Sequence, residues 1–154
     1  MLEVRYIYHF DNKPVNEYTL KNGRFQISIL NLGAAITKII VPNQHDKLEN
    51  ITLRYHDYKL YIDNKYNLGC LIDIDKFINN VDYVLNYYFD CEVLENALKF
   101  TYSKDDNYIS VIYTLNDYEL LIEYQNNLQV NLGHIIFFNL SGNVKENINN
   151  HLLK

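Results

Sequence analysis

Three neighbouring segments decide the fold: residues 97–103 (ALKFTYS), 108–115 (YISVIYTL) and 118–124 (YELLIEY). Apolar and polar residues alternate through each segment with a period of two, which is typical of strands with one buried face. The two connections, KDDN at 104–107 and ND at 116–117, are short and polar. Because such short turns join adjacent antiparallel strands, the three segments predict a β-meander.

The N-terminal half has the same organisation. Residues 18–20 are followed by Lys21-Asn22-Gly23, and an Asn-Gly pair before an alternating run is a strong hairpin signal. In that run one face carries Phe25, Ile27 and Ile29, and the other carries Arg24, Gln26 and Ser28. Further strands are expected at residues 1–10, 34–41 and 48–55, and in one or two pieces of 128–140. Residues 67–74 are apolar around Gly69. Residues 56–64 are expected to form a short helix or loop, and 73–80 a polar connection.

Many short strands at close spacing predict an all-β fold, an antiparallel β-sandwich. The chain has 154 residues, the usual size of one domain, and no Pro- or Gly-rich linker divides it. We therefore expect a single domain over residues 1–142, followed by a polar C-terminal tail over 143–154.

Composition and charge exclude several classes of partner. The formal net charge is −5 and no cluster of Lys or Arg is present, whereas binding to nucleic acid requires concentrated positive charge. No segment approaches the roughly 20 apolar residues of a membrane helix. Cys70 and Cys91 lack metal-ligand spacing, and the alternating N-terminus does not resemble a secretory signal. We expect neither nucleic acid nor a membrane as partner, and a cytoplasmic location.

Motifs for metal, cofactor or nucleophilic chemistry are absent from the sequence. The five histidines form no His-x-x-x-His pair, and Asp73-x-Asp75 lacks the glycine and distal glutamate of a calcium loop. There is no Gly-x-Ser-x-Gly elbow, phosphate loop or dinucleotide fingerprint. We expect no metal and no cofactor, and the residues alone indicate no reaction.

Two regions nevertheless carry a family resemblance. Residues 18–23 (YTLKNG), 29–34 (ILNLGA) and 40–42 (IVP) resemble the N-terminus of the aldose 1-epimerases, the galactose mutarotases. Residues 130–132 (VNL) and 138–142 (FNLSG) resemble a later stretch of that family. The resemblance implies a galactose mutarotase-like fold, here a partial supersandwich.

The resemblance also implies a chemistry, from which this sequence departs. Mutarotases interconvert sugar anomers with a general acid and a general base. In the family the acid is a histidine in the later stretch and the base is a glutamate near the C-terminus. An ungapped match places Ile135 at the position of the catalytic histidine and His134 one residue earlier, on the opposite face of a strand. The chain ends at Lys154, before the segment that would supply the glutamate.

These departures predict a catalytically degenerate aldose 1-epimerase-like protein with no catalytic residues of its own. Its expected ligand is a hexose or hexose phosphate, and the candidate binding residues are His134 and Asn139. One alternative is an active mutarotase with a rearranged or intersubunit site; another is a non-enzymatic protein-interaction module. Because a shortened sandwich would expose strand edges and apolar surface, we also expect a homodimer.

Overall fold

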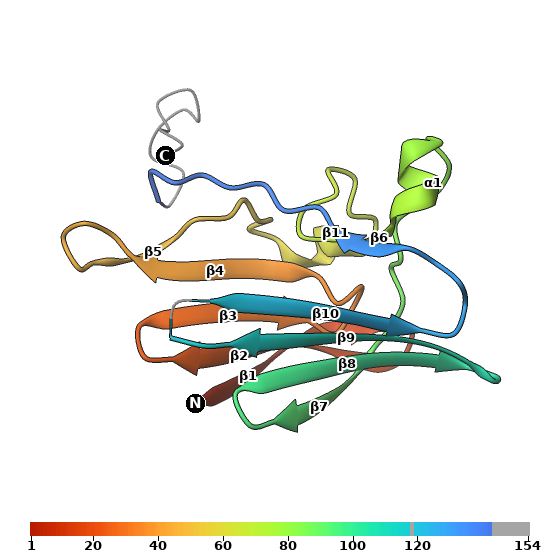
Figure 1. The fold of residues 1–154 in the computed structure, drawn as a ribbon, viewed down its shortest axis with the longest axis horizontal. Helices are drawn as coiled ribbons and strands as arrows, with labels where there is room; N and C mark the ends of the chain where they lie inside the picture. Colours follow the sequence, from red (N-terminus) through yellow and green to blue (C-terminus); the bar gives the residue numbers. More distant parts are fainter. Residues whose placement is uncertain (118, 143–154) are drawn as a thin grey trace.

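The computed structural model describes residues 1–117 and 119–142, and two antiparallel sheets dominate them (Figure 1). The first sheet has five strands in the order of the sequence, because each strand pairs with the one before it. They are β1 (Leu2–Phe10), β2 (Lys13–Asn22), β3 (Phe25–Leu30), β4 (Ile36–Pro42) and β5 (Leu48–Asn50). The predicted hairpin joins β2 to β3, where Asn22 pairs with Phe25 around Gly23.

The second sheet contains the predicted meander. Its order is β10-β9-β8-β7, and the strands are β7 (Asp90–Leu94), β8 (Ala97–Lys104), β9 (Asn107–Leu115) and β10 (Leu120–Asn126). The register runs without interruption from Ala97 opposite Thr114 to Lys104 opposite Asn107. The β-meander read from the alternation of residues 97–124 is confirmed.

A third, smaller layer lies beside the first sheet and contains His134, one of the two candidate binding residues. It consists of β6 (Leu71–Asp73) paired with β11 (Leu132–His134), followed after β6 by the helix α1 (Ile74–Ile78). Figure 1 shows this pair and α1 together, above one end of β4 and β10. A 3-10 helix, η1 (Tyr58–Tyr61), lies in the connection between β5 and β6.

The main core lies between the two large sheets. Leu20, Ile27 and Ile29 from β2 and β3 are buried in one cluster with Phe100 and Val111 from β8 and β9. The ring of Tyr18 meets that of Phe100 edge to face, with the centroids 5.5 Å apart. Facing sheets with a shared apolar core make a β-sandwich, so the predicted fold class is confirmed.

A second cluster covers one end of the opposite, outer face of the five-stranded sheet. Val15 and Leu30 lie on that face, and Tyr55 and Tyr61 pack over them from the η1 region. The rest of the outer face carries polar side chains such as Gln26 and Ser28 of β3, with Ile40 of β4 among them.

Several boundaries differ from the sequence prediction. The connection expected over 73–80 contains the helix α1 (Ile74–Ile78), because the Asp73 carboxylate accepts hydrogen bonds from the N–H groups of Asp75 and Lys76 and caps the helix N-terminus. The strand expected over 48–55 ends at Asn50, whose side-chain oxygen accepts the N–H of Ile39. The strand content expected in 128–140 is limited to the three residues of β11.

The predicted tail, residues 143–154, lies outside the described residues. Within the described part of the chain, no helix has the length and apolarity needed to cross a bilayer.

Candidate functional site

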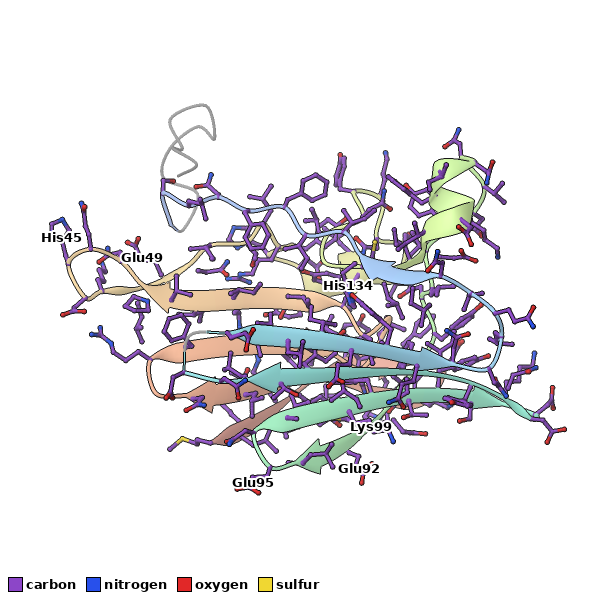
Figure 2. All side chains as sticks on the ribbon, viewed as in Figure 1. His45, Glu49, Glu92, Glu95, Lys99 and His134 are labelled. Carbon is purple, nitrogen blue, oxygen red and sulfur yellow. The ribbon has the colours of Figure 1, made fainter. Side chains whose placement is uncertain are left out.

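His134 projects from β11 onto the meander sheet, and both of its ring nitrogens have protein partners (Figure 2). The Tyr113 hydroxyl donates to the Ala34 carbonyl at 2.6 Å, so it accepts from Nε2–H of His134 at 2.9 Å. The Tyr124 hydroxyl lies 2.8 Å from Nδ1 and donates to it. These partners fit the neutral imidazole with its proton on Nε2. His134 therefore serves the packing of β11 against β9 and β10.

Burial lowers the pKa of His134 to about 4, while the Ala34 carbonyl acts weakly in the opposite direction. The residue as a whole keeps some exposed surface, but its ring nitrogens face the two tyrosines and the backbone. Because the pKa lies below that of an unfolded histidine, the unfolded state binds more protons at mildly acidic pH. The contribution of His134 to stability is therefore complete at pH 7 and is lost as the pH falls from about 6.5 towards 4.

We expect the free energy of unfolding to fall by about 2 kcal/mol between pH 7 and pH 5 because of this one group. Urea unfolding at the two pH values measures the change. His134→Gln should lose that part of the pH dependence, whereas His56→Gln, at an exposed histidine, should keep it. Equal pH dependence in the wild type and His134→Gln would show that the imidazole is not held neutral.

Asn139, the second candidate from the sequence, makes hydrogen bonds with the backbone of neighbouring residues. Its N–H donates to the carbonyl of Ile51 at 2.8 Å, and its side-chain oxygen accepts the N–H of Ser141 at 3.2 Å. Its carbonyl accepts the N–H of Gly142 at 3.2 Å. Asn139 and His134 have no hydrogen-bond partner in common among the described residues. Sugar binding by these two side chains stays a prediction.

Ile135 occupies the position at which the resemblance places the family's acid. Its N–H donates to the Cys70 carbonyl at 3.0 Å, which extends the pairing of β11 with β6. Its aliphatic side chain cannot transfer a proton. Within the described residues no group of three or more His, Cys, Asp or Glu side chains has the geometry of a metal site.

The outer face of the five-stranded sheet carries a groove of about 540 Å³. It lies beside the end covered by η1, and a smaller hollow continues it towards β1 and β2. The residues lining the groove are Gln26, Lys38, Ile40, Leu48, Asn50, Thr52, Leu53, Arg54 and His56.

A buried carboxylate stands where the groove meets its smaller extension. Glu17 is only 2% exposed, and its Oε1 accepts the hydroxyls of Thr37 at 2.6 Å and Tyr58 at 2.7 Å. Its Oε2 accepts from Arg5 at 2.9 Å and Lys38 at 3.1 Å. Burial alone would raise the pKa of Glu17, but the hydroxyls and the Lys38 ammonium lower it below its usual value. Glu17 is thus ionised, and it fixes the side chain of Lys38 beside the groove.

Two other polar side chains of the lining, Gln26 and Arg54, differ from Lys38 in their bonding. Within the described part of the chain, the Arg54 guanidinium makes no hydrogen bond or ion pair, and the Gln26 amide makes no hydrogen bond. The hydroxyl of Thr52, in contrast, donates to Asn50 at 2.9 Å. Within the described residues, the groove therefore combines the fixed Lys38 ammonium with an unpaired guanidinium, an unpaired amide and the apolar side chains of Ile40 and Leu53.

Sequence reasoning did not find this groove. The outward positions of Gln26 and Ser28 were visible in the alternation of β3, and they are the signal that a polar face exists. Arg54 and His56 come from the irregular segment after β5, and no local pattern indicates that this segment returns to the outer face.

The sheet order and the antiparallel pairing place this chain in a fold class: it is an antiparallel β-sandwich that contains part of the galactose mutarotase-like fold. The chain is similar in structure to the galactose 1-epimerase of Lactobacillus acidophilus NCFM, with a TM-score of 0.68 and 17% sequence identity over 90% of this chain and 53% of that one. It is also similar to an aldose epimerase homologue from C. elegans, with a TM-score of 0.68 and 13% identity over 81% of this chain and 51% of that one.

The chain thus spans about half the length of the solved structures that it matches. No model of a known protein family matches it, and no curated protein does. The structural resemblance to aldose epimerases extends over most of the chain, and at these identities it concerns the fold.

Proposed function

We propose that this chain is a non-catalytic aldose 1-epimerase-like domain that binds a carbohydrate in the groove on the outer face of the five-stranded sheet. The observation that carries the proposal is the groove itself, in which the Gln26 amide and the Arg54 guanidinium make no hydrogen bond within the described residues and lie next to apolar side chains. Its volume of about 540 Å³ is within the usual range of small-molecule sites. Sugars present both hydroxyls and apolar C–H faces, and this lining offers partners for each.

The non-catalytic part of the proposal is supported by the positions that would carry the reaction. Opening and reclosing a sugar ring requires a proton donor and a proton acceptor near the anomeric centre. His134 has both ring nitrogens bonded to protein groups, and Ile135 has no ionisable group. Neither position provides an acid to a bound sugar.

Chemical-shift mapping with glucose and galactose tests where a sugar binds. We expect saturable shifts in the amides of β3, β4 and residues 50–56, with weak affinities that require tens of millimolar sugar. Gln26→Ala should weaken the binding because it removes a free amide of the lining. Gln125→Ala, which removes an exposed amide from β10 in the other sheet, serves as the matched control.

Two outcomes would contradict the proposal. Absence of saturable shifts with either sugar would leave the interaction module as the alternative. Shifts centred on His134 and Asn139 would favour the site expected from the sequence, and with it an active enzyme whose site is rearranged or shared between subunits. The homodimer and the cytoplasmic location stay proposals, and light scattering measures the first.

A further inference from the structure

The ionisable side chains that line the groove are all basic. They are Lys38, Arg54 and His56, and the described lining contains no Asp or Glu. The chain as a whole has a formal net charge of −5. A positive hollow on an acidic protein raises the local concentration of anions and disfavours cations.

Arg54 is the cation of the groove that remains available to a ligand. The Lys38 ammonium lies 3.1 Å from the Glu17 carboxylate, and Arg5 of the neighbouring hollow lies 2.9 Å from it. The Arg54 guanidinium has no such partner within the described residues. A guanidinium binds phosphate through two parallel hydrogen bonds, which makes it the preferred side chain for this group.

The numbers of hydrogen-bond donors and acceptors in the groove also favour a ligand that carries a phosphate. Arg54 has five N–H donors and Lys38 three, whereas the Gln26 amide brings two donors and one acceptor oxygen; the nearby Glu17 carboxylate already accepts four hydrogen bonds. Each hydroxyl of a neutral hexose brings a donor that requires an acceptor, whereas the oxygens of an ionised phosphate only accept. A groove with more donors than acceptors therefore favours a ligand that carries a phosphate.

We propose that the ligand is a phosphorylated hexose, with its phosphate bound by Arg54 and assisted by Lys38. The sugar ring lies against Ile40, within reach of the Gln26 amide. This inference rests on the proposed carbohydrate binding and adds the class of ligand and the residue that selects it.

Isothermal titration with glucose 6-phosphate, glucose and inorganic phosphate tests the inference. We expect glucose 6-phosphate to bind at least about tenfold more tightly than either of the others, because a hydrogen bond to a charged group adds to the contacts of the sugar. Arg54→Gln should reduce its affinity to about that of glucose, and Arg54→Lys should reduce it less. Lys99→Gln removes the same charge from β8 in the other sheet (Figure 2) and should leave the affinity unchanged.

The outcomes separate this inference from the proposed function. Equal affinities for glucose and glucose 6-phosphate would overturn the phosphate assignment and leave carbohydrate binding intact. Inorganic phosphate binding as tightly as glucose 6-phosphate would also overturn it, because the sugar would contribute nothing. Failure of all three to bind would contradict both. If Arg54→Gln does not fold, two other measurements test the phosphate contact. Arg54→Lys should bind glucose 6-phosphate more weakly than the wild type, and high salt should weaken wild-type binding of glucose 6-phosphate; no change in either would overturn the inference.

Discussion

Replacing Glu17 by alanine is expected to lower the free energy of unfolding by about 3 kcal/mol. The carboxylate accepts hydrogen bonds from Thr37, Tyr58, Arg5 and Lys38. Its removal leaves the two hydroxyls without this acceptor and brings two positive charges together without their counter-ion. The loss is at the low end for a broken buried ion pair, because the Arg5 and Lys38 side chains are 52% and 22% exposed and reach water.

Chemical denaturation of Glu17→Ala and of Glu3→Ala measures this effect with an internal control. Glu3 pairs with Lys21 at 2.8 Å on the same sheet, but its side chain is 59% exposed, so its removal should change stability little. Similar losses for the two variants would mean that the Glu17 cluster contributes no more than a surface ion pair.

Gly69→Ala is expected to destabilise the chain by about 3 kcal/mol as well, through the backbone. Gly69 has a φ of +62°, and a Cβ there would lie 1.9 Å from the carbonyl oxygen of Ile36. The Gly69 carbonyl also accepts the N–H of Ile36 at 2.9 Å, so the two backbones cannot move apart without losing this bond.

Gly23→Ala is the matched control for this substitution. Gly23 has a φ of +56°, but an added Cβ would have no atom within 4 Å. Its cost is the left-handed backbone alone, about 1 to 2 kcal/mol. Thermal or urea unfolding of the two variants should therefore differ by the cost of the steric clash, and equal losses would contradict the close approach of Gly69 to β4.

The sequence predicts those parts of the fold whose pattern is local. The meander and the β2–β3 hairpin have long runs of alternating apolar and polar residues separated by polar turns. Their registers can be predicted because the apolar residues of paired strands must lie on the same, buried face of the sheet. β6 and β11 have only three residues each, which is too short for a period to appear. Helix α1 could have been read from Asp73, an N-cap residue, but its five residues carry no helical period.

The candidate site was less accessible from the sequence than the fold. The family resemblance directs attention to His134 and Asn139, whose polar atoms bond to the protein in the folded chain. The groove is formed by β3, β4 and the irregular segment that contains Arg54 and His56. This segment lies over the outer face because Tyr55 and Tyr61 pack there against Val15 and Leu30. Such tertiary packing leaves no periodic signal.

We propose that this chain has the galactose mutarotase-like fold in part and does not accelerate mutarotation. Polarimetry of freshly dissolved α-glucose and α-galactose, with and without the protein, measures it directly. We predict that both sugars mutarotate at the rate of the buffer, since neither His134 nor Ile135 provides an acid to a sugar. Acceleration by the wild type that is lost in His134→Ala, with the variant shown to be folded, would contradict the account.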